Sequence, residues 1–437
     1  MFESKAPFRS RIGLALAAPG VATAMAGYSA HAASGGMIVV PAMHAIVRHG
    51  KEAAPPLDEI PETGDTIVGA MRRIWLLALV GALAVTLSSW GKKKKEEETQ
   101  VLQLPKDPPS ALTVETRRLI FQVTPLSAKG LLSQQTRDAL KWLLHSTNGA
   151  AVVKLRAFVA GSGDLRRVRE LVAEIFTEHR MALPVLSVVQ VGALPLEAAQ
   201  VVLEATAVAK KDVNQYGLVY ISGQGASSGE PLDPVPPLAQ QSLARLATAV
   251  KAARSEPGDV ARVTCFLSSL DRYAEVRRLV ESSYTGAALN FVQVQRAPAR
   301  AVAECEAVAR LRWNTGAAIH MLNPEGLAQS PQLSQIALIG APKVILTGSQ
   351  EAFGFQDADA RLAFERLQKS LSQEGGSLRQ AAFTSMYPLS SKISEQVRKI
   401  RGEFYDGARP PAGTMLPFQG LPSMDAGFAV DVVAVKE

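Results

Sequence analysis

The chain has 437 residues, a formal net charge of +7 and two cysteines. Its length suits two to four domains, while two cysteines are too few for a disulfide framework. The six histidines are dispersed, so we predict no metal site and no cofactor. The basic residues are scattered and lack interleaved aromatic residues, so we also predict no nucleic-acid partner.

Residues 1–70 are rich in Ala, Gly and Pro. Within them, residues 12–33 are mildly apolar and contain Ala30-His31-Ala32, which resembles a signal-peptide cleavage site. Pro19 and several glycines interrupt this stretch. We therefore interpret residues 1–70 as disordered. A second interpretation is that Met71 is the true first residue.

Residues 74–90 contain no charge, and Trp75 and Trp90 lie at their two ends. Because aromatic and basic residues bracket membrane helices in this way, we predict one transmembrane helix at 71–91, in a bacterial-type inner membrane. Four lysines follow the helix and two arginines precede it, which predicts that the C-terminal body is cytoplasmic. Residues 92–114 are charged and contain proline, as an extended linker does.

The remaining residues repeat one order of elements three times. Each repeat begins with an apolar strand (119–121, 218–221 and 344–346) and a longer helix (around 134–146, 238–253 and 360–373). An alternating strand follows (152–159, 260–267 and, more weakly, 378–384), and then an amphipathic helix (165–176, 273–284 and 393–404). Each repeat ends in an apolar strand that carries an acid (202–208, 304–309 and 429–435).

Two helices on one face of a mixed sheet make a two-layer α+β sandwich. We therefore predict three α+β domains in tandem, at 115–209, 210–313 and 314–437. A sheet with helices on only one face still has another apolar face to bury. Three such sheets can bury these faces against each other.

The second repeat resembles the RidA/YjgF family in four segments: Tyr220-Ile221-Ser222-Gly223-Gln224, 263–267, 292–298 and 306–309. The first repeat is similar to the family at 189–195 and Glu204, and the third at 348–350, 419–422 and Asp431. The resemblance implies the RidA-like, chorismate-mutase-like sandwich for each repeat. Because the family forms homotrimers with clefts between subunits, it also implies an intramolecular pseudo-trimer.

The resemblance further implies which residues line the clefts. Ser222 and Gln224 are expected to bind a ligand, together with the acids Glu204, Glu306 and Asp431, which in the family help to activate the attacking water. The alternative for the acids is a structural role, with bonds to backbone amides of a neighbouring strand. The alternative for Ser222 is a turn at a strand end. Cys265 and Cys305 are interpreted as small core residues.

The family's catalytic arginine, which clamps a substrate carboxylate, has no counterpart in this sequence. Its position falls on Leu186, Leu289 and Gly413, and the family's Pro-Tyr-Ser-Gln segment is also absent. Arg296 and Arg300 are the nearest candidates to reach the cleft of the second repeat. No residue is therefore assigned as catalytic.

These features favour a non-catalytic, membrane-anchored RidA-like pseudo-trimer. We predict that it acts as a binding or scaffold module, as a protein subunit of a larger membrane complex. One alternative is an enzyme, an imine or enamine deaminase or a related hydrolase with a modified cleft. Another is a sensor that binds a small carboxylate or imine metabolite.

Overall fold

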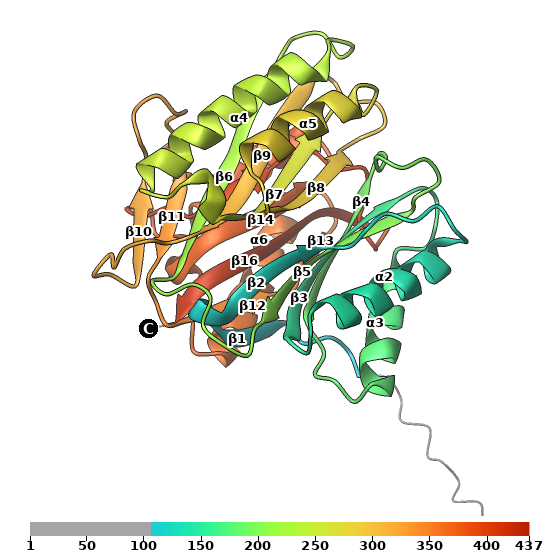
Figure 1. The fold of residues 1–437 in the computed structure, drawn as a ribbon, viewed down its shortest axis with the longest axis horizontal. Helices are drawn as coiled ribbons and strands as arrows, with labels where there is room; N and C mark the ends of the chain where they lie inside the picture. Colours follow the sequence, from blue (N-terminus) through green and yellow to red (C-terminus); the bar gives the residue numbers. More distant parts are fainter. Residues whose placement is uncertain (1–105, 437) are drawn as a thin grey trace, which may run out of the picture. The chain divides into compact units, whose positions relative to one another are not determined.

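The computed structural model describes residues 106–436 (Figure 1). The predicted N-terminal segment at 1–70, the transmembrane helix at 71–91 and the linker up to residue 105 lie outside the described residues. Within residues 106–436, no helix is both long and apolar enough to cross a membrane.

The first sheet has four strands in the order β2-β5-β3-β4. They are β2 (Leu119–Val123), β3 (Ala151–Ala160), β4 (Val185–Val191) and β5 (Val201–Val208). β3 and β4 are parallel, and the other neighbours are antiparallel. The helices α2 (Leu132–Ser146) and α3 (Arg166–Glu178) cover one face of this sheet (Figure 1).

The second sheet has six strands in the order β10-β11-β6-β9-β7-β8. They are β6 (Leu218–Ser227), β7 (Val260–Leu267), β8 (Ala288–Gln293), β9 (Val302–Arg310), β10 (Ile319–Leu322) and β11 (Ile336–Ile339). The short helix η2 (Pro257–Asp259) leads into β7. Figure 1 shows α4 (Val235–Ala252) and α5 (Tyr273–Ser283) lying together over one face of this sheet.

The third sheet has the order β1-β12-β16-β14-β15, and β13 also pairs with β16. Its strands are β1 (Ala111–Glu115), β12 (Lys343–Thr347), β13 (Gln350–Phe353), β14 (Ala381–Pro388), β15 (Ala412–Met415) and β16 (Ala426–Lys436). Its helices are α6 (Asp357–Gln373) and α7 (Ser391–Arg401).

In the second and third sheets, an outer strand comes from a chain segment that directly precedes a strand of another sheet. β1 lies just before β2 in the sequence, separated by the short helix η1 (Thr116–Arg118), yet it pairs with β12 of the third sheet. β11 lies just before β12, yet it pairs with β6 of the second sheet. β1 begins at Ala111, inside the segment predicted as a linker. Among residues 106–436, the first sheet has no strand beyond β2.

Apolar stripes on the helices explain which faces are buried. On α3, Val168, Val172 and Phe176 are fully buried, whereas Arg166 and Arg169 are exposed. Each pair of helices encloses a core against its own sheet. Two further cores combine residues of all three sheets, and one of them contains Leu119, Leu218 and Val344. The other faces of the three sheets are therefore buried against one another, as predicted.

Two details of the predicted elements need correction. Each sheet contains a parallel edge strand, β4, β8 or β15, that the predicted order of elements omitted. The segment 378–384, predicted as a strand, begins as the short helix η3 (Leu378–Gln380), and β14 starts only at Ala381. The polar residues Arg379 and Gln380 belong to this helix, which explains why the third strand signal was weak.

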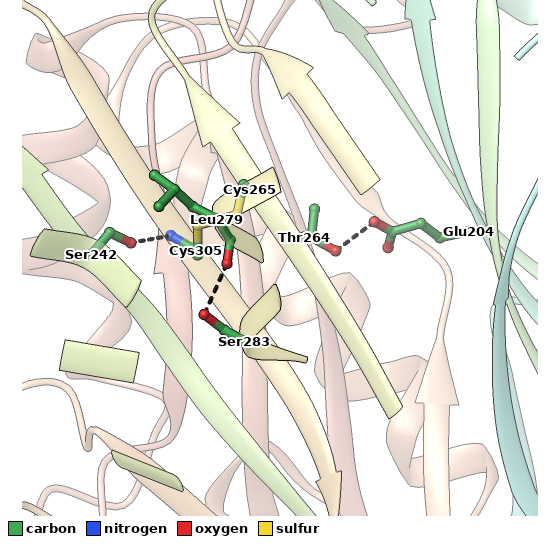
Figure 2. The surroundings of a disulfide bond; sticks show 7 residues. All are labelled: Glu204, Ser242, Thr264, Cys265, Leu279, Ser283 and Cys305. Atoms are coloured by element: carbon green, nitrogen blue, oxygen red, sulfur yellow. Dashed lines mark hydrogen bonds between the residues drawn. A yellow bond between two sulfur atoms is a disulfide. The ribbon is translucent and has the colours of Figure 1, made fainter. Parts of the chain in front are cut away.

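Cys265 and Cys305 are both fully buried, as expected of core residues, but they are also joined by a disulfide bond (Figure 2). They lie directly opposite each other on β7 and β9. The two cysteines are 40 positions apart in the chain, so only the register of the two strands brings them together. No local sequence pattern signals this bond.

Candidate functional site

Three acids face the region where the sheets meet. Glu204 on β5, Glu306 on β9 and Asp431 on β16 are each at most 2% exposed. Each lies directly opposite a polar residue of the neighbouring strand in its own sheet: Arg156 on β3, Thr264 on β7 and Ser385 on β14, respectively. The three acids therefore occupy corresponding positions in the three sheets.

Glu204 is bonded by residues of two sheets. Its Oε2 accepts a hydrogen bond from Arg156 Nε at 2.8 Å, and its Oε1 accepts from Asn290 Nδ2 at 2.7 Å. Oε1 also accepts from Thr264 Oγ1 at 2.6 Å, the bond drawn in Figure 2. Burial alone would raise the pKa of Glu204, but the charges of Arg156 and Arg262 outweigh it and lower the pKa to about 2. The Glu204 side chain is therefore a carboxylate at neutral pH.

Glu306 and Asp431 are bonded in the same manner. Glu306 accepts from Arg156 Nη2 and from Thr414 Oγ1, both at 2.6 Å. Asp431 accepts from Lys154 Nζ at 2.5 Å and Ser187 Oγ at 2.7 Å, and also from Tyr387 Oη at 3.0 Å. The partners are thus side chains rather than the backbone amides that the structural alternative predicted.

These bonds follow a cyclic order among the sheets. Glu204 of the first sheet bonds Asn290 of the second, Glu306 of the second bonds Thr414 of the third, and Asp431 of the third bonds Ser187 of the first. The three partners lie on the parallel edge strands β8, β15 and β4. The buried acids therefore join neighbouring sheets and leave little capacity for a ligand.

Ser222 and Gln224 are also buried and internally bonded. Ser222 Oγ donates to the carbonyl oxygen of Ser334 at 2.6 Å and accepts from the backbone N–H of Gly413 at 2.8 Å. Gln224 Nε2 donates to the carbonyl oxygen of Ser222 and to Gln335 Oε1. Ser222 therefore joins the second sheet to Gly413 of the third, and neither Ser222 nor Gln224 is open to solvent.

The positions of the missing arginine have three different surroundings. Leu186 is buried in the core beneath α2 and α3. Gly413 has no room for a larger residue, because an added Cβ would come within 2.4 Å of the carbonyl oxygen of Thr384. Leu289 lines a cleft of about 430 Å³ between the first and second sheets.

This cleft, here called the β2–β8 cleft, is mainly apolar. On the side of the first sheet it is lined by Leu126 and Val202, and on the side of the second by Leu289, Asn290 and Phe291. The helix α5 contributes Tyr273, Arg277 and Glu281. Arg277 and Glu281 form an ion pair with each other at 2.7 Å. The volume suits a small ligand, but the position that would clamp a carboxylate is occupied by Leu289.

Glu304 is the titratable residue that the sequence analysis did not single out. Burial is the main cause that raises the pKa of Glu304 to about 8, with the nearby charge of Glu306 adding to it and Arg300 opposing it. The carboxylate lies over Gly223, where an added Cβ would be 2.0 Å from its Oε1, and near Gly225. Glu304 stands two residues before Glu306 in the same strand, and that spacing places both side chains on one face.

Comparison with known proteins supports the family assignment for the middle of this chain. Residues 210–313 match the family model described as Endoribonuclease L-PSP. The chain contains a RidA/YjgF-family domain. This RidA-like domain holds β6 to β9, α4 and α5, and it includes Ser222, Gln224, Glu304 and Glu306. No protein with a curated description matches the chain.

Three solved structures illustrate the similarity. A Rid-family protein of unknown function from Yersinia pestis has 18% identity and a TM-score of 0.26, covering 28% of this chain and 100% of its own. A YjgF/YER057c/UK114-family protein from Mycobacterium tuberculosis has 18% identity and a TM-score of 0.21, covering 27% and 99%. The YjgF gene product of E. coli has 30% identity and a TM-score of 0.19, covering 22% and 81%. At these TM-scores, the structures add no argument beyond the family model.

Proposed function

We propose that the chain is a non-catalytic, membrane-anchored RidA-like protein that acts as a binding or scaffold module, as a subunit of a membrane complex. The observation that carries this proposal is the state of the five predicted ligand-binding residues. Ser222, Gln224 and the acids Glu204, Glu306 and Asp431 are all buried, and all are bonded within the protein.

We further propose that the three sheets with their helices are tandem copies of one domain, at 115–209, 210–313 and 314–437, arranged as an intramolecular pseudo-trimer. The cyclic bonds from Glu204 to Asn290, Glu306 to Thr414 and Asp431 to Ser187 support this arrangement. A heterologous contact that repeats around a closed ring produces such an order.

The anchor in this proposal is the apolar segment at 71–91. Its side of the membrane has two opposed indications. The count of lysines and arginines favours a cytoplasmic body, whereas disulfides such as Cys265–Cys305 persist mainly in oxidising compartments. We give more weight to the disulfide, because a reducing compartment would keep the two cysteines as thiols, and we propose that the body lies on the oxidising side.

A second candidate function is hydrolysis of an imine or enamine, and Glu304 is the observation that favours it. A carboxyl group whose pKa lies near 8 is protonated at neutral pH and can both donate and recover a proton. It is only partly exposed and lies beside Gly223, in the segment that resembles the family's cleft.

One experiment separates the two candidates. The full-length protein is purified from gently solubilised membranes, and hydrolysis of 2-aminoacrylate-type imines is measured for the wild type, Glu304→Gln and Glu306→Gln. We expect no hydrolysis above the buffer rate in any of them, and a stoichiometric protein partner by mass spectrometry. Hydrolysis by the wild type that is lost in Glu304→Gln but kept in a folded Glu306→Gln would establish the enzyme instead.

A further inference from the structure

The free edge of β2 differs from the corresponding edges of the other two sheets. β2 and β5 are antiparallel, and the bonds Ala209 N–H to Arg118 C=O and Thr124 N–H to Leu203 C=O fix which backbone groups face β5. Even-numbered residues of β2 face β5 and odd-numbered residues face away from it. The outward groups in the middle and at the end of β2 therefore belong to Phe121 and Val123.

The equivalent outward groups of the second and third sheets are bonded by an exchanged strand. In the second sheet, Tyr220 pairs with β11, and the next outward N–H, that of Ser222, donates to the carbonyl oxygen of Gln335. In the third sheet, Leu346 pairs with β1, and the N–H of Gly348 donates to the carbonyl oxygen of Ser110. The second and third sheets thus each have an additional strand at the edge that corresponds to the free edge of β2.

Nothing among residues 106–436 takes this place beside β2. The segment that precedes β6, by analogy with β1 and β11, would be the one to do so. Instead, its residues bond η1 and the first residue of β2: Val213 N–H and Asn214 N–H donate to Arg117 C=O, and the Asn214 side chain donates to Leu119 C=O. Within the described residues, the backbone N–H and C=O of Phe121 and Val123 have no hydrogen-bond partner. Unpaired groups of this kind are a template for another strand.

The same comparison accounts for the β2–β8 cleft. In the second sheet, the residues that lead into β11 fill the junction with the third sheet. Ser334 N–H donates to Pro411 C=O, and Ser334 C=O accepts from Ser222 Oγ. At the corresponding junction of the first and second sheets, Val123 and Thr124 line the open cleft of about 430 Å³. The unpaired edge of β2 and the open cleft therefore adjoin, at the place where the other two sheets hold an exchanged strand and the residues that lead into it.

We propose that β2 and the β2–β8 cleft bind an extended segment of a partner protein, which adds to the first sheet as an antiparallel strand. This inference rests on the proposed binding role and names its partner. β1 and β11 indicate the chemistry of the segment: four or five residues with apolar side chains on the face toward the shared core, as with Val114 of β1 and Ile339 of β11. Backbone bonds to Phe121 and Val123 supply affinity, and the cleft receives the residue that leads into the strand.

The test uses the full-length protein in detergent and a synthetic peptide of residues 107–117, which contains β1 and its lead-in. Binding is measured by fluorescence anisotropy, and amide hydrogen exchange is measured at Phe121 and Val123. We expect saturable binding and at least tenfold slower exchange at both amides when the peptide is bound. Val123→Pro removes an outward N–H and is compatible with an edge strand, so it should abolish binding. Val123→Thr keeps the N–H and should bind like the wild type.

Two results would overturn this proposal. One is slow exchange at Phe121 and Val123 before any peptide is added, since the edge would then be covered by another part of the chain or by a second copy. The other is peptide binding that survives Val123→Pro in a protein with a wild-type melting temperature. Neither result concerns imine hydrolysis. Conversely, hydrolysis lost in Glu304→Gln would refute the non-catalytic role and leave the edge measurement valid.

Discussion

Arg156 provides the sharpest test of the proposed junction between the sheets. Its guanidinium bonds Glu204 and Glu306 at once, and the residue is 4% exposed. Replacing it in Arg156→Met leaves two buried carboxylates without their main partner. Breaking a buried ion pair in this way costs about 3–5 kcal/mol, mostly through the charge that stays behind. Arg262 lies 3.4 Å and 3.8 Å from the same two carboxylates and keeps the cost from doubling.

The assay is thermal unfolding of the full-length protein followed by circular dichroism. Given about 2–4 °C per kcal/mol for domains somewhat smaller than this body, we expect the melting temperature to fall by roughly 6 °C or more. Arg167→Met is the matched control, because Arg167 pairs with Glu170 and Glu174 on the surface of α3 and should cost less than about 1 kcal/mol. Adding Glu306→Gln to Arg156→Met removes one stranded charge and should restore part of the loss. An Arg156→Met protein that melts within about 2 °C of the wild type would refute the reasoning.

Three further predictions concern other sites. Because burial raises the pKa of Glu304 to about 8 from the ordinary 4.5 of a glutamate side chain, its contribution to stability is complete below about pH 4.5 and is lost as the pH rises through 8. Urea unfolding should therefore show a fall in stability over this range that is absent in Glu304→Gln, and parallel profiles would contradict the assignment. Changing both Cys265 and Cys305 to serine opens a loop of 40 residues and should lower the free energy of unfolding in urea by about 4 kcal/mol. In protein denatured directly from membranes, the wild-type cysteines should react with a maleimide only after reduction. A reaction without reduction would show free thiols and indicate a cytoplasmic body. Leu289→Arg places a guanidinium in the β2–β8 cleft and should bind pyruvate by calorimetry, with Leu289→Met as the inactive control; no binding would mean that the cleft does not present residue 289 to a ligand.

Much of the fold follows from the sequence because it depends on local patterns. Alternating strands and helical stripes, such as Val168, Val172 and Phe176, identified the order of elements. The exchange of β1 and β11 between sheets did not follow, because strand pairing depends on which edge is nearest in space rather than on the strand's own residues. The bounds of the first and third repeats were predicted as if each sheet were built from one continuous segment.

The candidate site was predicted by residue type, and its environment was not. Glu204, Glu306 and Asp431 were selected correctly as corresponding acids, yet several of their partners lie in other sheets, up to 277 positions away for Lys154 and Asp431. No local pattern reports such a distance. Glu304 was overlooked because its signal is the pair of glycines, Gly223 and Gly225, on the opposite strand. Small residues across from an acid are recognisable only once the register is known.

The residues opposite the three acids differ in charge: one is an arginine, one a threonine and one a serine. In a ring of three identical subunits, whatever occupies this position occurs three times around one axis. Three guanidiniums would repel each other there, and three serines would leave the carboxylates without a counterion. A single chain is free of this constraint, because each of the three positions is encoded separately and can hold a different residue. The order of the segments along the chain therefore makes each of the three junctions chemically distinct. A partner can bind one junction without having to be complementary to the other two.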